Sequence, residues 1–222
     1  MSDVAPLAAQ DRESFIAAHT RLTQTPHAPS VLLHVADEAT TLWEKTEEEL
    51  GELGLPPPFW AFAWAGGQAL ARYLLDNPTI VRGKRVFDLA SGSGLVAIAA
   101  AKAGAACVIA NEIDEFALAA ISLNAKINHV AIEIMAGDVV GRAINADVIC
   151  AGDVFYERDM ASRIEAWLRD LAANGVEALV GDPGRSYFPK DRLEKLAEYQ
   201  VPVTRALEDA EIKRTAVWRL SA

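Results

Sequence analysis

Cysteine is scarce in this chain, which has only two cysteines among its 222 residues, Cys107 and Cys150. Small secreted domains that are held together by disulfides contain many more. Neither cysteine stands at a zinc-ligand spacing from the other or from the four histidines. Both lie inside apolar runs of the kind that form buried strands. We therefore expect two reduced cysteines in the core and no metal site.

Long apolar segments are also missing. No run approaches the roughly 20 apolar residues that cross a bilayer. The first residues lack the basic and apolar regions of a secretion signal and the arginine-rich character of a transit peptide. Basic residues are outnumbered, 21 against 31 acidic ones, so the net charge is −10. Because an acidic surface disfavours the phosphate backbone of nucleic acids, we expect no nucleic-acid partner, and because no apolar run could span a bilayer, we expect no membrane partner.

What is present is a regular alternation of strands and helices from residue 84 onward. Such alternation produces right-handed βαβ crossovers and a parallel sheet with helices on both faces. The end differs, because two strand-like segments around a turn at 207–211 predict an antiparallel hairpin. We expect a Rossmann-like, doubly wound α/β fold with seven mostly parallel strands and this C-terminal hairpin. The predicted strands are 84–89, 106–112, 131–136, 146–152, 176–181, 201–206 and 212–220, and the predicted helices are 93–103, 115–127, 157–173 and 190–199.

The first part of the chain has a different pattern. We divide the chain into a small helical N-terminal extension, 1–55, and a ligand-binding domain, 56–222. The elements predicted before residue 84 are a helix over 11–19, a strand over 31–36, a charged helix over 38–50, a proline-led break at 56–64 and a helix over 66–75.

The motif Val86-Phe-Asp-Leu-Ala-Ser-Gly-Ser-Gly94 is the most informative segment, because it predicts a strand, a tight turn and the N-terminus of a helix. In such a turn the backbone N–H groups face a ligand, and glycines let that ligand approach closely. The spacing also fits a dinucleotide fingerprint, which leaves an NAD(P)-dependent dehydrogenase as an alternative. Asp88 argues against it, because a carboxylate at the mouth of the turn repels pyrophosphate and attracts an ammonium or sulfonium group. S-adenosylmethionine carries both of these cations, and the alternative for Asp88 is that it only caps the turn.

Acidic residues end or follow four successive predicted strands, at Asp88, Glu112, Asp138 and Asp153. The carboxyl ends of parallel strands converge at one edge of an open sheet, where such folds bind ligands. Glu112 stands 18 positions after Gly94, a spacing that suits a ribose-binding carboxylate. Asp138 is expected beside the adenine amino group, with a simple turn residue as the alternative.

Five segments together resemble a known family. The motif at 86–94 and Asn111-Glu-Ile-Asp114 are similar to motifs of the seven-β-strand S-adenosylmethionine-dependent methyltransferases. Three further segments narrow the resemblance to protein-lysine methyltransferases of the family 16 type: Pro58-Phe-Trp-Ala-Phe-Ala-Trp-Ala-Gly-Gly-Gln-Ala-Leu70, Gly152-Asp-Val-Phe-Tyr156 and Gly181-Asp-Pro-Gly-Arg185. The last segment is the most discriminating. Many relatives have Asp where this chain has Glu112, and either carboxylate can accept from a ribose.

The resemblance implies S-adenosylmethionine as cofactor, S-adenosylhomocysteine as its product and lysine ε-amines of a protein as acceptor. Asp153 is expected to orient the amine, and Tyr156 to act as a channel wall or hydrogen-bond donor, with a core position as the alternative for Tyr156. Substrate contacts are expected from Trp60, Asp182 and Arg185. Their alternatives are core packing for Trp60 and an ion pair between Asp182 and Arg185. The expected cofactor-binding residues are Trp64, Asp88, Ser91, Gly92, Gly94, Glu112, Ile113, Asp138 and Val139.

Within this group the resemblance is to enzymes that modify the β subunit of electron-transfer flavoprotein, so that subunit is the expected partner. Another protein, such as a ribosomal protein, or a small amine are alternative acceptors, and a non-catalytic cofactor-binding role is a further alternative. Because the family's mitochondrial members would need an import sequence, we expect a bacterial, cytoplasmic protein. We expect it to act as a monomer.

Overall fold

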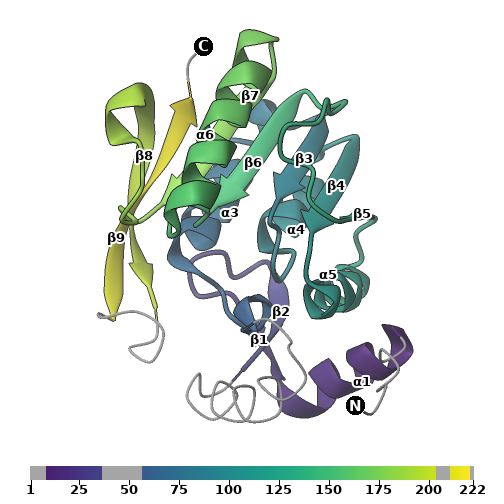
Figure 1. The fold of residues 1–222 in the computed structure, drawn as a ribbon. Coiled ribbons are helices and arrows are strands. Elements are labelled where there is room, and N and C mark those ends of the chain that lie inside the picture. The colour runs from purple at the N-terminus through teal and green to yellow at the C-terminus, as the bar shows by residue number, and fades with distance from the viewer. Residues whose placement is uncertain (1–8, 37–56, 204–210, 221–222) are drawn as a thin grey trace, which may run out of the picture.

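A computed structural model describes residues 9–36, 57–203 and 211–220 of the chain. Its centre is a seven-stranded sheet in the order β5-β4-β3-β6-β7-β9-β8 (Figure 1). Strands β3 to β7 are parallel, and β9 runs antiparallel to both β7 and β8. The strands are β3 (Arg85–Leu89), β4 (Cys107–Glu112), β5 (Glu133–Ala136), β6 (Val148–Gly152), β7 (Glu177–Asp182), β8 (Leu193–Pro202) and β9 (Ile212–Leu220).

Helices lie on both faces of the sheet, as the alternation predicts. Helix α6 covers one face and lies in front of the sheet in Figure 1, and α3 and α4 cover the opposite face. Helix α5 packs next to β4 and β5. The predicted doubly wound α/β fold is confirmed. The helices are α3 (Ala65–Asp76), α4 (Leu95–Lys102), α5 (Glu115–Ile127) and α6 (Arg158–Ala173).

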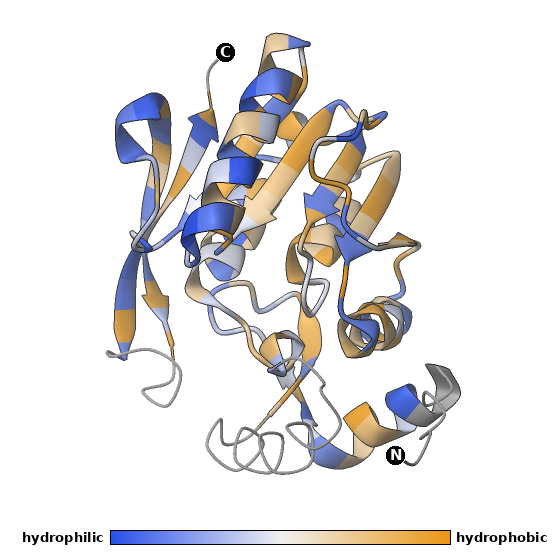
Figure 2. Ribbon diagram, viewed as in Figure 1, coloured by the Kyte–Doolittle hydropathy of each residue, from blue (hydrophilic) through white to orange (hydrophobic). Residues whose placement is uncertain are grey.

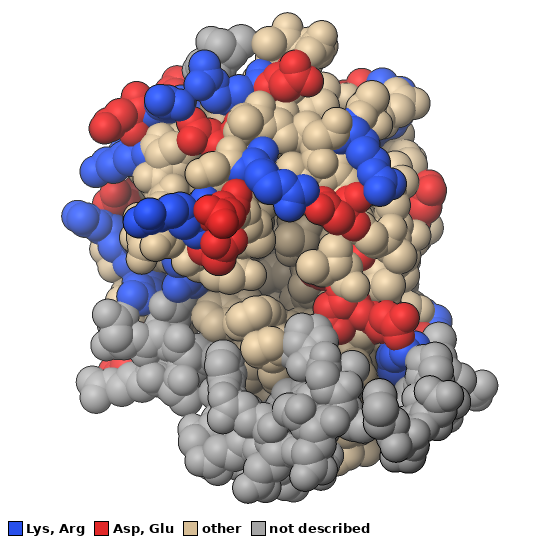
Figure 3. Space-filling view, in the orientation of Figure 1, with Lys and Arg blue, Asp and Glu red and all other residues tan. Residues whose placement is uncertain are grey.

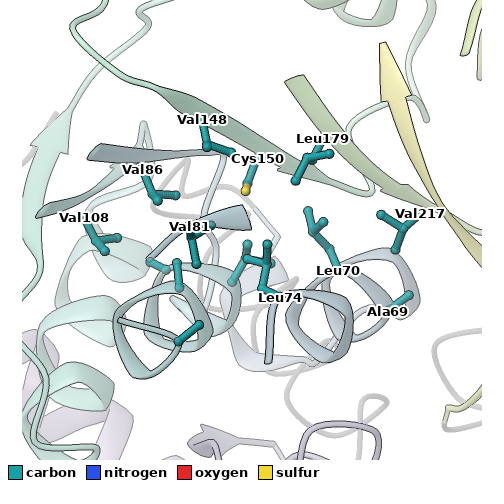
Figure 4. Packing of buried hydrophobic residues seen from close by; sticks show 14 of the residues in the cluster. Ala69, Leu70, Leu74, Val81, Val86, Val108, Val148, Cys150, Leu179 and Val217 are labelled. Carbon is teal, nitrogen blue, oxygen red and sulfur yellow. The ribbon is translucent and has the colours of Figure 1, made fainter. Parts of the chain in front are cut away.

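Alternating side chains on the strands divide the core into two layers. On β6, Val148 and Cys150 join the layer beneath α3 and α4, which Leu70 and Leu74 fill from the helix side (Figure 4). Ile149 on the same strand joins the layer beneath α6. Each fully buried side chain of this size stabilises the fold by roughly 1.5–3 kcal/mol. Figure 2 shows the result, with apolar residues along the central strands and polar residues on the β8–β9 hairpin.

The C-terminal hairpin is confirmed, but its first strand replaces a predicted helix. The sequence predicts a helix over 190–199, whereas β8 begins at Leu193 and pairs with the whole of β9. Residues 193–198 are good helix formers, which explains the wrong prediction. Pairing with β9 and the full burial of Val201 override this local preference. The predicted turn at 207–211 lies almost entirely outside the described residues.

The N-terminal part combines a helix with a hairpin. Helix α1 (Ala9–His19) packs against α5, and β1 (Arg21–Gln24) pairs antiparallel with β2 (Leu32–Val35). The helix and the second strand are predicted from the sequence, but β1 is not, because four residues are too few to show a period. The predicted helix over 38–50 lies outside the described residues. The division of the chain after residue 55 stays a prediction.

The two cysteines are both free thiols in different environments. Cys150 is fully buried, as predicted, and burial raises the pKa of its thiol. The prediction of a core position is wrong for Cys107, because it is the first residue of β4 and is exposed there. Within the described ranges, no helix is long and apolar enough to cross a membrane. In the same ranges, no three His, Cys, Asp or Glu side chains gather as metal ligands would.

Candidate functional site

The carboxyl ends of β3 and β6 lie side by side where the strand order reverses. In an open parallel sheet this switch point is where ligands bind. The acids predicted as strand tips lie along this edge, at the ends of the strands or in the turns that follow. The surface is hollowed next to this edge, between the lower end of α6 and α5 (Figure 3).

The loop between β3 and α4 turns sharply through residues with positive φ. These are Ala90 (φ 50°), Gly92 (φ 55°) and Gly94 (φ 84°), the last being the N-cap of α4. A Cβ on Gly94 would also contact Ile121 of α5 at 3.5 Å. Around Gly92, no atom of the described residues lies within 4 Å of where a Cβ would stand. The predicted strand, turn and helix are confirmed, and the loop is open on the Gly92 side.

Asp88 is buried beneath this loop, with 1% of its surface exposed. Its Oδ2 accepts from the backbone N–H of Ala97 (3.0 Å) and from the Ser91 hydroxyl. Burial raises the pKa of Asp88 to about 7, although both hydrogen bonds oppose that rise. Asp88 therefore ties the loop to the first turn of α4, which fits the turn-capping alternative. Direct attraction of a cationic ligand by Asp88 stays a prediction.

Glu112, the last residue of β4, has a carboxylate that lies against the same loop. Its Oε2 accepts from the Gly92 N–H (3.0 Å), and its Oε1 accepts from the Ile113 N–H (2.7 Å). Oε1 also accepts from the Asp114 N–H (3.4 Å), so it is Oε2 that keeps a further lone pair with which it can accept from a hydroxyl group. The Ile113 side chain is 72% exposed, so it offers an apolar surface beside the carboxylate. This combination suits a ribose and a flat base.

Asp138 lies exposed in the turn after β5. Its Oδ1 accepts from the Val140 N–H (2.9 Å), and its Oδ2 accepts from Nη2 of Arg163 on α6 (2.8 Å). The Arg163 hydrogen bond holds the pKa of Asp138 below its usual range. Val139 beside it is buried in the layer beneath α6. The structure thus shows a turn residue that pairs with α6, and contact of Asp138 or Val139 with adenine stays a prediction.

Helix α5 connects the glycine loop to the N-terminal hairpin through two buried asparagines. Asn124 donates from Nδ2 to the Ser93 carbonyl (2.8 Å) and accepts at Oδ1 from the His34 N–H (2.9 Å). One turn later, Asn128 accepts from the Leu32 N–H (3.0 Å) and donates to the Leu32 carbonyl (2.6 Å). Both side chains therefore hydrogen-bond to strand β2. Among the described contacts of these two residues, the hydrogen bond to the glycine loop comes from Asn124.

Asp153 follows β6 with a φ of 56°, a conformation that costs a non-glycine residue roughly 1–2 kcal/mol. Its Oδ2 accepts from the Gly67 N–H at the N-terminus of α3 (2.9 Å). Its Oδ1 accepts from Nη2 of Arg185 (2.7 Å), and the Asp153 side chain is 10% exposed. A helix N-terminus and a guanidinium both compensate a carboxylate's negative charge. The structure therefore presents an ion pair at the end of β6.

Glycines bring the start of α3 into contact with these strand ends. A Cβ on Gly66 would overlap the Asp153 carboxylate and the Gly181 carbonyl, and a Cβ on Gly152 would lie 3.0 Å from the backbone nitrogen of Gly67. The helix thus approaches β6 and β7 more closely than side chains would permit. Gly66 and Gly67 are not among the predicted site residues, although a glycine pair at a helix start is a signal of close approach.

Aromatic side chains form a wall next to this ion pair. The Arg185 guanidinium lies 5.5 Å from the ring centroid of Trp64, whose Nε1 donates to the Phe59 carbonyl (2.9 Å). The rings of Phe59 and Tyr156 lie 5.9 Å apart between centroids. Tyr156 is 51% exposed, so the core alternative is wrong for it. Phe59 is not among the predicted residues, and its place in the aromatic run is the signal that could have found it.

The other predicted substrate residues have different surroundings. Asp182 is buried, and its Oδ1 accepts from the backbone N–H of Arg185 (2.7 Å), while the Arg185 side chain binds Asp153. Burial raises the pKa of Asp182 to about 7. Asp182 thus shapes the turn that presents Arg185. Trp60 is 3% exposed and stacks on Phe116, which fits its core alternative, so a substrate contact by Trp60 stays a prediction.

Comparisons with known sequences find methyltransferases that are similar to this chain. The signature of the family described as Ribosomal protein L11 methyltransferase (PrmA) matches residues 69–155. The electron transfer flavoprotein beta subunit lysine methyltransferase of Xenopus laevis is 38% identical over 212 residues, which cover 92% of this chain and 85% of that protein. The protein of the same name from Danio rerio is 35% identical over 217 residues, which cover 94% of this chain and 83% of that one.

Solved structures share the fold at low identity. Magnesium protoporphyrin IX methyltransferase from Synechocystis with bound SAM matches with a TM-score of 0.53 at 13% identity, over 84% of this chain and 99% of its own. A tRNA (uracil-54, C5)-methyltransferase from Pyrococcus abyssi matches with a TM-score of 0.50 at 16% identity, over 68% of this chain and 38% of its own. At this identity the likeness shows a shared Rossmann-like α/β fold and says nothing of the reaction or the methyl acceptor.

Proposed function

Since this chain belongs to the family of electron transfer flavoprotein beta subunit lysine methyltransferases, we infer that it transfers methyl groups from S-adenosylmethionine to lysines of the β subunit of electron transfer flavoprotein. The observation that carries this inference is the 38% identity across 92% of the chain. The site supports it with an acid and an aromatic wall at the end of β6.

The glycine loop and the end of β4 fit the nucleoside part of S-adenosylmethionine. Glu112 presents its carboxylate oxygen Oε2 to the ribose hydroxyls, and the exposed Ile113 offers an apolar surface to the adenine. Trp64, beside the ion pair, would pack against the methionine part. When bound, the cofactor supplies a sulfonium methyl group, whose bond to sulfur breaks as an amine lone pair forms the new bond to carbon, so the positive charge passes to nitrogen.

The acceptor nitrogen must have a free lone pair, and a lysine amine with an ordinary pKa near 10.4 is rarely neutral at pH 7. Asp153 is placed to accept a hydrogen bond from the ε-amine and so to direct its lone pair. Burial raises the pKa of Tyr156, so its hydroxyl stays protonated and can donate a hydrogen bond. Holding the amine in line contributes most of the rate, because positioning can lower a barrier by several kcal/mol, roughly 7–11 at best.

The experiment is to incubate the purified protein with radiolabelled S-adenosylmethionine and recombinant electron transfer flavoprotein, with a whole-cell extract in parallel. Label on lysines of the β subunit supports the proposal, and mass spectrometry then identifies those lysines. Label on a ribosomal or other extract protein alone would keep the enzyme class and overturn the substrate. No label, with cofactor binding confirmed separately, would favour a small amine acceptor or a non-catalytic binder.

We further propose that the protein acts as a monomer in the bacterial cytoplasm, without a nucleic-acid or membrane partner. The net charge of −10 supports the exclusion of nucleic acid, since phosphate backbones are bound mainly by Lys and Arg. Light scattering tests the monomer, and a binding titration with RNA and with anionic vesicles tests the two exclusions.

A further inference from the structure

The guanidinium of Arg185 contacts both the Asp153 carboxylate and the ring of Trp64. Its Nη2 donates to Asp153 Oδ1 (2.7 Å), its Nε contacts the same oxygen (3.2 Å), and its Cζ lies 5.5 Å from the Trp64 ring centroid. An aromatic face beside a carboxylate is a favourable environment for a positive charge. A fixed cation of the enzyme thus shares the environment that the substrate amine has to enter.

Burial strengthens the electrostatic interaction between Arg185 and Asp153. The Arg185 side chain is 19% exposed and the Asp153 side chain 10%. Charges interact several-fold more strongly in such surroundings than in water. The Gly67 N–H at the start of α3 also binds the other Asp153 oxygen (2.9 Å). The negative charge of Asp153 is therefore compensated from two sides before a substrate arrives.

The other ionisable groups near Asp153 do not supply a positive charge that could compensate its carboxylate. Asp182, at the end of β7, is buried, and burial raises its pKa to about 7. Tyr156 has a raised pKa and stays neutral, and Glu112, which influences Tyr156 from β4, is bound by loop N–H groups. Among these groups of the described part of the site, Arg185 is therefore the one whose charged side chain hydrogen-bonds directly to Asp153.

An isolated carboxylate would orient a lysine amine but would also stabilise its ammonium form, which cannot attack. We propose that Arg185 resolves this conflict: its charge neutralises Asp153 and repels an ammonium, so that the site accepts the neutral ε-amine while Asp153 still accepts its hydrogen bond. Arg185 is in this sense a positioning residue that acts through Asp153. The inference rests on the proposed function, because it concerns the acceptor of that reaction.

The test compares the pH dependence of kcat, which reports groups in the bound complex, for methylation of saturating flavoprotein β subunit by the wild type, Arg185→Met and Arg185→Lys. In Arg185→Met, we expect the rising limb of the activity profile to move to higher pH by about 1–2 pH units. This is the size of the interaction between two unit charges roughly 6–7 Å apart in a partly buried site. Activity should recover toward the wild-type value at high pH. Arg185→Lys, which keeps the charge, should restore most of the wild-type profile.

Two controls separate this role from a structural one. Arg192→Met removes an arginine that pairs with Glu165 on the surface, and it should leave the profile unchanged. Repeating Arg185→Met in an Asp182→Asn background removes the second group that titrates near neutral pH, and the upward shift should persist. A loss by the same factor at every pH would overturn the proposal, because it would show that Arg185 only supports the loop.

A second measurement does not depend on turnover. Calorimetric titration of the β subunit into the complex with S-adenosylhomocysteine, in buffers of different ionisation enthalpy, counts the protons released as the ammonium becomes an amine. The wild type should release a larger fraction of a proton than Arg185→Met, and equal release would overturn the role of Arg185. Absence of methylation by the wild type at every pH would instead overturn the proposed function.

Discussion

The acids that end β3 and β4 and the acid that follows β6 are held in different ways at the carboxyl edge of the sheet. On β3 and β4, Asp88 and Glu112 are bound by backbone N–H groups and by a hydroxyl of the glycine loop and α4. On β6, Asp153 is bound by one backbone N–H and by the guanidinium of Arg185. Asp88 and Glu112 are therefore held by neutral donors that are fixed in the fold, whereas Asp153 is held in part by a charged side chain.

The difference shows what the acids in each place are suited to do. Neutral, rigid donors suit an acid that has to bind ribose hydroxyls in one fixed geometry. An acid that has to orient an amine without keeping it protonated needs a partner of opposite charge. We therefore expect changes on β3 and β4 to act on cofactor affinity, and changes on β6 and β7 to act on the rate and its pH dependence.

The largest expected effect is that of Asp153→Asn. It should lower kcat by roughly 10²–10⁴-fold, the contribution of a well-placed side chain that handles the reacting group. Cofactor affinity should stay within about 3-fold of the wild type, since this acid is not one of those that end β3 and β4. Steady-state kinetics and a binding titration with S-adenosylmethionine check both values. Asp191→Asn, an exposed acid, is the control, and a matching loss of cofactor affinity in Asp153→Asn would break the comparison.

Glu112→Ala should have the opposite signature. We expect cofactor binding to weaken by about 10–100-fold, because hydrogen bonds to a charged group contribute roughly 1.5–3 kcal/mol. At saturating cofactor, kcat should change much less than in Asp153→Asn. Calorimetry measures the affinity, and Glu112→Asp, which keeps the charge on a shorter side chain, should lose less. Unchanged affinity in Glu112→Ala would refute the ribose assignment.

Asn124→Ala should produce a smaller effect from outside the site. It leaves the Ser93 carbonyl and the His34 N–H without this partner, and we expect cofactor affinity to fall by about 5–10-fold, part of the roughly 1–3 kcal/mol that such a loss costs. Asn128→Ala is the matched control, since its side chain hydrogen-bonds to β2 and to the Asn124 carbonyl but not to the glycine loop. It should lower the melting temperature and leave the affinity unchanged. Equal losses of affinity in both variants would show that the hairpin, not the loop contact, matters.

The buried Asp182 is expected to have the smallest effect on activity and to act on stability instead. Its folded-state pKa of about 7 lies above the usual value near 3.9, so the folded protein holds more protons between these pH values. The contribution of this carboxyl to stability is therefore complete below about pH 4 and is lost as the pH rises to about 7. The melting temperature of Asp182→Asn minus that of the wild type should increase from about pH 4 to about pH 7 and stay constant above pH 7. A constant difference would contradict the shifted pKa.

Local sequence patterns predicted the parts of the fold that local interactions decide. The helix over 115–127 is observed with the predicted bounds, because its apolar face and the Asp114 N-cap agree with its burial. The glycine loop is likewise confirmed, since its turn needs residues that tolerate positive φ. The position of Cys107 was predicted wrongly because an apolar run does not show that the first residue of the strand is exposed.

The interactions that define the site could not be predicted in this way. The pair of Asp153 with Arg185 spans 32 positions, and the contact of Asp153 with Gly67 spans 86. Contacts between residues so far apart in the chain leave no periodic pattern in the sequence. The sequence therefore indicates Asp153 and Arg185 as parts of separate motifs but does not predict that they pair. Strand β8 could not be predicted for a related reason. Its pairing with the distant β9 stabilises a strand more than its local composition favours a helix.

The most direct test of this account is the intact mass of the flavoprotein β subunit after incubation with S-adenosylmethionine and either the wild-type protein or Asp153→Asn. We predict methyl-mass additions on lysines with the wild type, and almost none with Asp153→Asn at equal cofactor saturation. No mass change with the wild type, or equal changes with both proteins, would contradict the assignment of this edge of the sheet to lysine methyl transfer.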